Sequence, residues 1–332
     1  MTIVNLINAK VPSLIHNKIF IFYVMNSIIA LSATVLMGYI AQRFGICMVR
    51  ATRNTLKGDP TLLVAILLSG AWIWLYSIGA FFNGWPLPFE RYEIHPIFMV
   101  GGFLFGVGAS INQACSISTL NELAKGHVGK ILTIMGWFIG WSIWTKLLAH
   151  NLISVNYVKE DALSLTNTLI VSVTVLITLA LFVLRFKPPI KLMLGVLSIG
   201  LIASLLFYLV PNWPLSQLMN DVGSAVLYQQ PTPSFLRIGI FFALLTGMWV
   251  AVAVNHNAKL RFPTARSGAR FLIAGTMMGI GAGMALGGND TQLLFGIPST
   301  SIGSLSALLF MFLGIVCEQL IYQRGGLIYR KA

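Results

Sequence analysis

Charged side chains are scarce in this 332-residue chain. They make up 9% of the residues, and only nine of them are acidic. Soluble domains carry about 25% charged residues, so this chain has too little polar surface to cover a globule in water. Hydrophobic residues account for 57% of the chain instead. The composition therefore excludes a soluble domain and predicts an integral membrane protein.

Cysteine is also scarce: three residues, an odd number, do not form a disulfide framework. The five histidines are scattered, with no pair four residues apart and no carboxylate cluster. No phosphate-binding Gly-Lys-Ser/Thr loop, Ser-His-Asp order or haem motif is present. The sequence thus predicts no metal site, no cofactor and no enzyme. Because an ATPase motif is missing as well, any transport is expected to be passive or ion-coupled.

The apolar runs are long and continuous, which is typical of helices that span about 30 Å of hydrocarbon rather than of barrel strands. The first run follows two lysines but is too long for the core of a signal peptide, so we expect it to be a mature span. The sequence predicts an all-α polytopic membrane protein with a single transmembrane domain over 1–332. The nine membrane-entering segments that we expect are 19–41, 61–81, 97–114, 129–149, 167–185, 191–210, 234–255, 270–287 and 301–322.

The net charge of +13 lies in the loops, which indicates membrane topology rather than nucleic-acid binding. Residues 42–58, 185–191, 257–270 and the C-terminal tail are basic, whereas the loop 211–233 has no Lys or Arg. The positive-inside rule places the basic segments in the cytoplasm. With nine spans, the N-terminus is then outside and the C-terminus is inside.

Two glycine-rich segments share one register. Residues 101–115 read GGFLFGVGASINQAC and residues 274–288 read AGTMMGIGAGMALGG. The predicted topology lets the first segment enter from outside and the second from inside, which is the arrangement of an inverted repeat. We expect 19–149 and 191–322 to form the two repeat halves, with 150–190 as the connecting span and loop.

Both glycine segments end in small polar residues, 112–116 and 287–291, which are poor at continuing an apolar helix. Polar backbone at membrane depth is tolerated only where it is buried in protein or lines a cavity. We therefore predict two broken, re-entrant helical hairpins whose tips meet near the membrane midplane. Gly102 and Gly106 lie four residues apart, as do Gly275 and Gly279, a spacing that favours close helix packing. For most of these glycines, packing alone is the better interpretation.

Cys115 closes the first glycine segment. Thr119 and Glu122 are spaced as a capping box, so we expect a short helix to begin here. A helix N-terminus favours an anion and a thiolate. Cys115 is therefore interpreted as a thiol beside an anion site, although a small buried core residue is the alternative.

Cys47 lies at the end of the first span among Arg43, Arg50 and Arg53. Positive charge attracts anions and stabilises a thiolate, although the arginines also serve as a positive-inside signal. Cys317 lies inside the last span and follows no loop, so we interpret it as a packing residue.

Three stretches in fixed order combine these features over most of the chain. They are Gln42-Arg43 with Cys47 and Arg53, then Gly101–Ala109 followed by Cys115, and then Met278–Ala282. In these stretches the chain resembles the YeeE/YedE sulfur-transport family, whose best understood members take up thiosulfate.

The resemblance implies an hourglass of transmembrane helices with two inward hairpins in a bacterial inner membrane. It also implies a constricted path lined by three cysteine thiols, two of which fall on Cys47 and Cys115. The third position falls on Gly288, and Gln113-Ala114 stands where the family usually has two glycines. Asp290, close behind, would repel a dianion unless it is paired or protonated.

The leading hypothesis is transmembrane uptake of a small, thiosulfate-like sulfur anion along a path lined by thiols. The expected path residues are Cys47, Gly108, Gln113, Cys115, Ser116, Gly281, Gly288, Asn289 and Asp290, and the expected anion-attracting residues are Arg43, Arg50 and Arg53. The resemblance also implies a small soluble sulfur-carrier protein as a partner at the cytoplasmic face. The alternatives are a sulfur relay in which Cys115 accepts a persulfide, a divergent paralogue that carries another small anion, and a scaffold that transports nothing.

Overall fold

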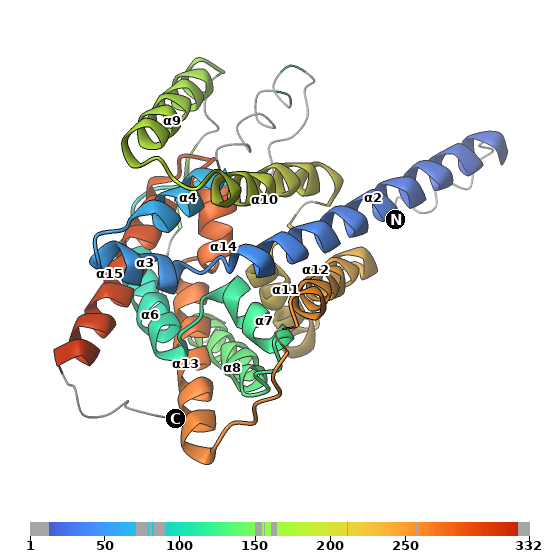
Figure 1. Ribbon diagram of the computed structural model, residues 1–332. Helices are drawn as coiled ribbons and strands as arrows, with labels where there is room; N and C mark the ends of the chain where they lie inside the picture. The colour runs from blue at the N-terminus through green and yellow to red at the C-terminus, as the bar shows by residue number, and fades with distance from the viewer. Residues whose placement is uncertain are drawn as a thin grey trace.

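The computed structural model describes residues 13–70, 79, 82, 90–149, 155, 157–160, 165–210, 212–256 and 258–324. The described chain is almost entirely helical, as predicted (Figure 1). Strands β1 (Arg91–Tyr92) and β2 (Lys159–Glu160) form one short antiparallel pair, with Arg91 opposite Glu160. This pair connects the segment before α6 (Pro96–Asn112) with the segment before α9 (Leu165–Phe186).

The first half of the chain contributes α2 (Ser13–Phe44), α3 (Met48–Leu56), α4 (Thr61–Ser69), α6 (Pro96–Asn112), α7 (Ser116–Ala124) and α8 (Lys130–Ala149). The second half contributes α9 (Leu165–Phe186), α10 (Ile190–Leu209), α11 (Leu215–Tyr228), α12 (Phe235–Val254), α13 (Ala265–Met284), α14 (Asn289–Thr291), the π-helical turn η2 (Gln292–Gly296) and α15 (Ile302–Arg324). In Figure 1, α13 runs through the middle of the molecule, and it packs against α6 and α8.

Several helices are suited to a bilayer, so the chain is a multi-pass membrane protein. Within the described ranges, five helices are long and apolar enough to cross a membrane. A sixth span results if α13 and the bent segment after it, which turns by 43°, are counted together. The count of nine spans stays a prediction, and the end of the expected segment 61–81 lies outside the described residues.

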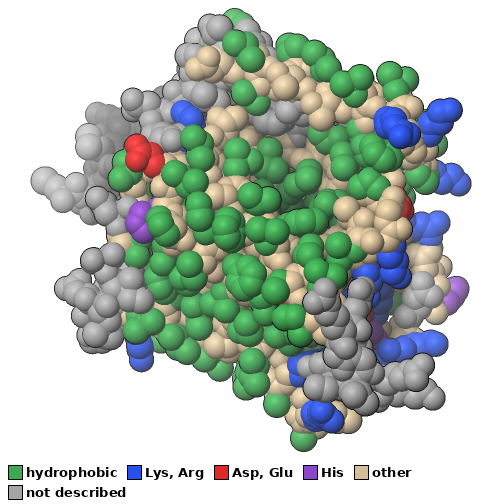
Figure 2. Space-filling view, turned by 90° about the vertical axis from the view of Figure 1, so that its left-hand side faces the viewer, with side chains coloured by type: hydrophobic (Ala, Val, Ile, Leu, Met, Phe, Trp, Pro, Cys, Tyr) green, Lys and Arg blue, Asp and Glu red, His purple; other side chains and the backbone are tan. Residues whose placement is uncertain are grey.

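Apolar side chains dominate the surface that Figure 2 shows, whereas Lys and Arg gather along one side and the lower edge of this view. Large hydrophobic residues are exposed on the membrane-length helices, for example Leu36 on α2, Ile273 on α13 and Leu309 on α15. Such a surface is unfavourable in water and matches the hydrocarbon of a bilayer, where helices satisfy their own backbone hydrogen bonds.

The first glycine segment packs directly on α15. A Cβ atom built at Gly102 would lie 2.2 Å from the carbonyl oxygen of Ala307, and one built at Gly106 would lie 2.1 Å from that of Met311. No side chain fits at such distances. The glycines therefore let the two backbones touch, as expected for small residues at this spacing.

The second glycine segment packs on α8 in the same way. A Cβ atom at Gly275 would lie 2.1 Å from the carbonyl oxygen of Thr133, and one at Gly279 would lie 2.2 Å from that of Trp137. The first half of the chain thus contributes the glycine helix α6 to one contact and the partner helix α8 to the other. The second half contributes the glycine helix α13 and the partner helix α15.

The helices α6 and α13 also contact each other, and their contact is reciprocal. A Cβ atom at Gly108 would lie 2.8 Å from the carbonyl oxygen of Ala274, while one at Gly281 would lie 2.5 Å from that of Gly101. These four residues stand at matching positions of the two glycine segments. Gly108 and Gly281 are thereby explained as packing residues, and their membership of a transport path stays a prediction.

The expectation of a loop over 211–233 was wrong, because α11 occupies Leu215–Tyr228. Leu215, Leu218 and Met219 are buried at helical spacing, and Gly223 lies against the ring of Trp141 on α8. This stretch was assigned to a loop from its charge pattern, since it has no Lys or Arg. The three-and-four spacing of its apolar residues was the signal that could have identified it.

Candidate functional site

The first glycine helix ends in a tight turn that leads into a second, short helix. Gln113 closes α6 in the left-handed conformation, with φ of 60°. Cys115 then forms the N-cap of α7, with φ of −83° and ψ of −171°. The predicted break after α6, and the helix that begins next to Cys115, are both present.

The second glycine helix ends in a turn of the same shape. Leu286, the counterpart of Gln113, is left-handed with φ of 57°, and Gly287 follows with φ of 151°, which favours glycine. Gly288, the counterpart of Cys115, caps α14 with φ of −78° and ψ of −174°. Its backbone conformation is one that any residue adopts.

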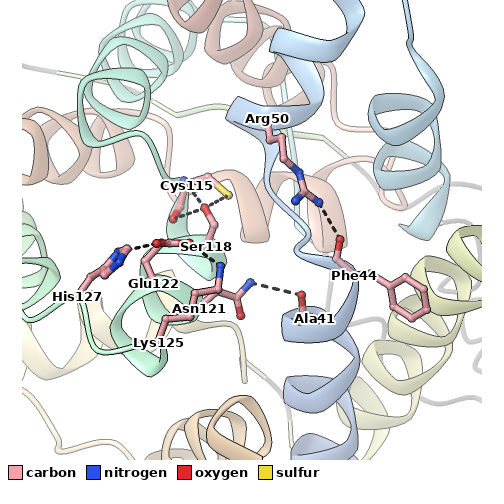
Figure 3. Close-up of polar contacts among 9 residues, drawn as sticks. All are labelled: Ala41, Phe44, Arg50, Cys115, Ser118, Asn121, Glu122, Lys125 and His127. Atoms are coloured by element: carbon pink, nitrogen blue, oxygen red, sulfur yellow. Dashed lines mark hydrogen bonds and ion pairs between the residues drawn. The ribbon is translucent and has the colours of Figure 1, made fainter. Parts of the chain in front are cut away.

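The capping of α7 differs from the expected one. Ser118, rather than Glu122, closes the capping box: its Oγ accepts the Cys115 backbone N–H at 2.6 Å and lies 3.3 Å from the Cys115 Sγ (Figure 3). Thr119 lies within α7 and donates to the Cys115 carbonyl oxygen at 2.8 Å. The Thr119–Glu122 box was therefore wrong, because the helix begins three residues before Thr119.

Two thiols meet at this turn. Cys47 is the N-cap of α3, and its thiol lies beside the thiol of Cys115, the hydroxyl of Ser118 and the backbone N–H of Arg50. Both thiols are buried, with exposed fractions of 8% for Cys47 and 2% for Cys115. The N-termini of two helices thus bring their positive dipole ends and two weak S–H donors to one place, which suits an anion.

A cavity of about 270 Å³ opens onto the Cys47 thiol, and two of the three predicted arginines, Arg50 and Arg53, line it. Cys47, Arg50, Arg53, Gln113 and Lys125 belong to its lining. A neighbouring cavity of about 280 Å³ is lined by Arg43, Arg50 and Lys125.

The sequence analysis did not assign Lys125 to the site, and it assigned Glu122 only a capping role. Lys125, just beyond α7, lines both cavities and pairs with Glu122 at 2.8 Å, while Glu122 also contacts His127 at 2.6 Å. Figure 3 shows this cluster beside Cys115. The Glu122–Lys125 spacing of three residues is a common pattern of helical surface pairs, which is why it carried no functional signal.

The tips of the two turns touch each other. The hydroxyl of Ser116 donates to the Asn289 Oδ1 at 2.8 Å, and the Ser116 backbone N–H points at the same oxygen at 3.3 Å. Ser116 and Asn289 occupy matching positions of the two segments and are both buried. A small space of about 40 Å³ next to this contact is lined by Cys115, Asn289 and Asp290 together with apolar side chains.

Asp290 is held by α11. Its Oδ2 accepts the backbone N–H of Ser216 at 3.0 Å, and the Ser216 hydroxyl contacts the Thr291 Oγ1 at 2.5 Å. Sequence reasoning missed Ser216, since α11 itself was expected to be a loop.

A larger cavity of about 670 Å³ reaches the second turn from another direction. Trp141 and Trp144 line it together with Glu90, Asp221 and Gln292. Its acidic residues are paired: Asp221 contacts Arg237 at 2.6 Å and Glu90 contacts Lys159 at 2.6 Å. The hydrogen bond from Lys159 lowers the pKa of the Glu90 carboxyl. The cavity of about 270 Å³, called the basic cavity below, thus adjoins the first turn. The cavity of about 670 Å³, with its acidic and aromatic lining, adjoins the second turn.

Cys317 lies apart from these groups. It is half-buried in α15 with no shared cavity among those described here, and its neighbour Glu318 accepts a hydrogen bond from the hydroxyl of Ser110 on α6 at 2.5 Å. This placement agrees with a packing role for Cys317.

Comparisons with known proteins place these residues in context. The family model described as "Sulphur transport" matches residues 43–317, which include all three cysteines. The chain is similar to the thiosulfate transporter TsuA of Escherichia coli (strain K12), with 22% identity over 338 residues that cover 87% of this chain and 93% of the relative. Both findings concern transport proteins.

Proposed function

The chain belongs to the sulphur transport family, and from this premise we propose that it carries a small, thiosulfate-like sulfur anion across the membrane along a path lined by Cys47 and Cys115. The observation that carries the proposal is the meeting of these two buried thiols at two helix N-termini, between the basic cavity and the contact of the two tips. The printed function of the relative, thiosulfate transport, supports the choice of substrate.

The chemistry of this place suits a weakly held anion. Thiols are poor hydrogen-bond donors and backbone N–H groups carry only partial charge, so an anion can enter from Arg50, Arg53 and Lys125 and leave again. The proposal includes an anion-attracting role for Arg43 at the neighbouring cavity. It also includes a small soluble sulfur-carrier protein as acceptor at this mouth, where Arg50 and Arg53 are exposed.

We further propose that the fold is an inverted repeat of the halves 19–149 and 191–322, joined by 150–190. The reciprocal contacts of the glycine segments support this, as do the like conformations of Cys115 and Gly288. In this arrangement the basic cavity faces the cytoplasm of a bacterial cell, the N-terminus lies outside the inner membrane and the C-terminus inside. The two tips then meet near the midplane.

The test is growth and radiolabelled thiosulfate uptake in a bacterial strain that lacks its own thiosulfate uptake. We expect the wild type to restore both and Cys115→Ala to abolish both, because the alanine removes the buried donor. Cys317→Ala is the matched control, since it deletes a thiol outside the described cavities, and it should behave as the wild type. Uptake that is unchanged by Cys115→Ala would overturn the thiol-lined path, and a persulfide trapped on Cys115 without uptake would favour the relay.

A further inference from the structure

Among the Lys, Arg, Asp and Glu residues that the structure describes, two have buried side chains, Lys130 and Asp290, with exposed fractions of 4% and 3%. The Lys130 ammonium has partners: it donates to the Oδ1 of Asn112 at 2.9 Å and to the Asn112 carbonyl oxygen. Asp290 is different, because its Oδ1 has no hydrogen-bond partner within the described part of the chain. A buried carboxylate without a balancing charge is far more costly than the neutral acid, because burial penalises the charged form most.

The groups around Asp290 offer no positive charge. On the α7 side, the small space that it lines holds Cys115, the one titratable neighbour there. Other sides of this space are lined by Ile66 and the uncharged Ser69 of α4, and by Val196 of α10. From α11 comes the backbone N–H of Ser216, while Asp221, further along that helix, is paired with Arg237. Among these neighbours, neither Lys, Arg nor His balances an ionised Asp290.

The free oxygen of Asp290 lies next to Gly288, which is the counterpart of Cys115 in the second segment. A Cβ atom built at Gly288 would lie 2.9 Å from the Asp290 Oδ1 and 3.1 Å from the hydroxyl of Ser116. The backbone at Gly288 has nearly the same φ and ψ as the backbone at Cys115. The carboxyl group of Asp290 therefore occupies the space into which a side chain at residue 288 would project.

We propose that Asp290, as a neutral carboxylic acid, is the third anion-binding group of the path, so that the anion binds together with one proton. The Oδ1–H donates a hydrogen bond to an oxygen or sulfur of the anion, the proton stays on Asp290, and no covalent bond changes. When Asp290 loses this proton, the carboxylate repels the anion. This inference rests on the proposed function and extends it to proton-dependent binding.

Binding of radiolabelled thiosulfate to the purified, full-length protein tests the proton requirement. Between about pH 5.5 and pH 8.5, we expect the wild-type Kd to rise about tenfold per pH unit once Asp290 ionises, because one bound proton is linked to one anion. Asp290→Asn keeps a donor but cannot ionise, so its Kd should not follow that slope. Cys317→Ala should match the wild type. A Kd that does not change with pH in the wild type, or an equal slope in Asp290→Asn, would overturn the proposal.

The infrared spectrum tests the protonation of Asp290 without any transport. The wild-type minus Asp290→Asn difference spectrum should contain the carbonyl band of a protonated carboxyl group at neutral pH. Glu318→Gln on α15 serves as the control, because it removes a different carboxyl group. If the difference spectrum shows an ionised carboxylate instead, the proposal is wrong, whatever the substrate is. If the protonated band is present but thiosulfate does not bind at any pH, the fault lies with the proposed substrate.

A pair of substitutions tests the exchange of thiol for carboxyl. Gly288→Cys alone should weaken thiosulfate binding, since its Cβ collides with the Asp290 Oδ1. Gly288→Cys combined with Asp290→Ala removes the collision and supplies a thiol, so it should bind thiosulfate more tightly than either single variant and without the pH slope of the wild type. A double variant no better than the worse single variant would contradict the exchange.

Discussion

The two tips of the molecule share a backbone and differ in chemistry. Gln113 and Leu286 make the same left-handed turn, and Cys115 and Gly288 continue it with nearly equal dihedral angles. At the first tip the Cys115 thiol lies beside the Cys47 thiol, which lines a cavity with basic walls. At the second tip the thiol is missing and the carboxyl group of Asp290 fills its space.

The comparison teaches that the fold and the binding groups are determined separately. The turn is determined by the glycine helices, whose backbones touch α15 in one half and α8 in the other. The chemistry depends on one or two side chains at the cap. A transporter can therefore change what one tip offers to a substrate without rebuilding its architecture.

The largest effect is expected where this shared architecture is broken. Gly106→Leu and Gly279→Leu each push a side chain into a carbonyl oxygen that lies 2.1 or 2.2 Å from the Cβ position. Overpacking costs about 1–3 kcal/mol in ordinary cores and more against rigid backbone, so both variants should lose most of the folded protein. The yield of monodisperse protein in detergent is the measurement.

The matched control for these glycines is Gly239→Ala in α12, whose Cβ would meet only the end of the Leu31 side chain at 3.3 Å. It should fold like the wild type. If Gly106→Leu fails while Gly279→Leu is tolerated, the two halves are not equivalent and the inverted repeat is contradicted.

A smaller effect is expected from the groups that hold the two caps. Ser118 touches the Cys115 thiol, whereas the Thr291 hydroxyl contacts Ser216 rather than a binding group. Losing one hydrogen bond costs about 1 kcal/mol, so Ser118→Ala should weaken thiosulfate binding about fivefold. Thr291→Val should change the Kd by less than about twofold.

A conservative substitution at Ser118 tests whether its hydroxyl is the group that binding requires. Ser118→Thr keeps the hydroxyl and should restore binding, and thermal unfolding of each variant separates a loss of binding from a loss of fold. An equal loss in Ser118→Ala and Thr291→Val would show that the first tip has no special share in binding.

Substitutions in the basic cavity should reduce thiosulfate uptake less than Ser118→Ala reduces thiosulfate binding. Replacing Arg53 and Lys125 by Gln removes two positive charges beside the Cys47 thiol. Electrostatic attraction of an anion falls with ionic strength, so thiosulfate uptake of this variant should drop about threefold at low salt and should depend less on salt than the wild type. Lys187→Gln removes a positive charge from the loop between α9 and α10 and serves as control. An unchanged salt dependence would contradict an attracting role.

Much of the first tip could be predicted from the sequence. The polar run after Gly108 indicated a broken helix, and the helix does begin directly after Cys115. The arginines near Cys47 line the cavities, and their attraction of anions stays a prediction. Short-range signals, such as glycine spacing and loops between apolar runs, were sufficient here.

The rest of the site depends on contacts between distant segments. Ser216 reaches Asp290 only because α11 folds back from a stretch without Lys or Arg. The capping partner of Cys115 is Ser118, although Thr119 and Glu122 have the more familiar spacing. Neither the partner of a buried carboxyl group nor the choice between adjacent caps is determined by local sequence alone, since tertiary packing decides both.

The smallest effect is expected at a carboxyl group that contrasts with Asp290. Glu90 and Lys159 pair at 2.6 Å, but their side chains are 56% and 62% exposed, so solvent screens the pair. Such exposed pairs contribute about 0–1 kcal/mol. Because Lys159 lowers the pKa of Glu90, the contribution is present above the pKa that the carboxyl has in the unfolded chain and is lost as the pH falls through the folded pKa. Lys159→Ala should therefore lower the thermal stability slightly at neutral pH and not at all in acid.

Glu90→Gln should leave the pH dependence of thiosulfate binding unchanged, because Glu90 is exposed and has a cationic partner. A changed pH profile would assign the proton-linked role to the cavity of about 670 Å³ that Glu90 lines, instead of to Asp290 at the second tip.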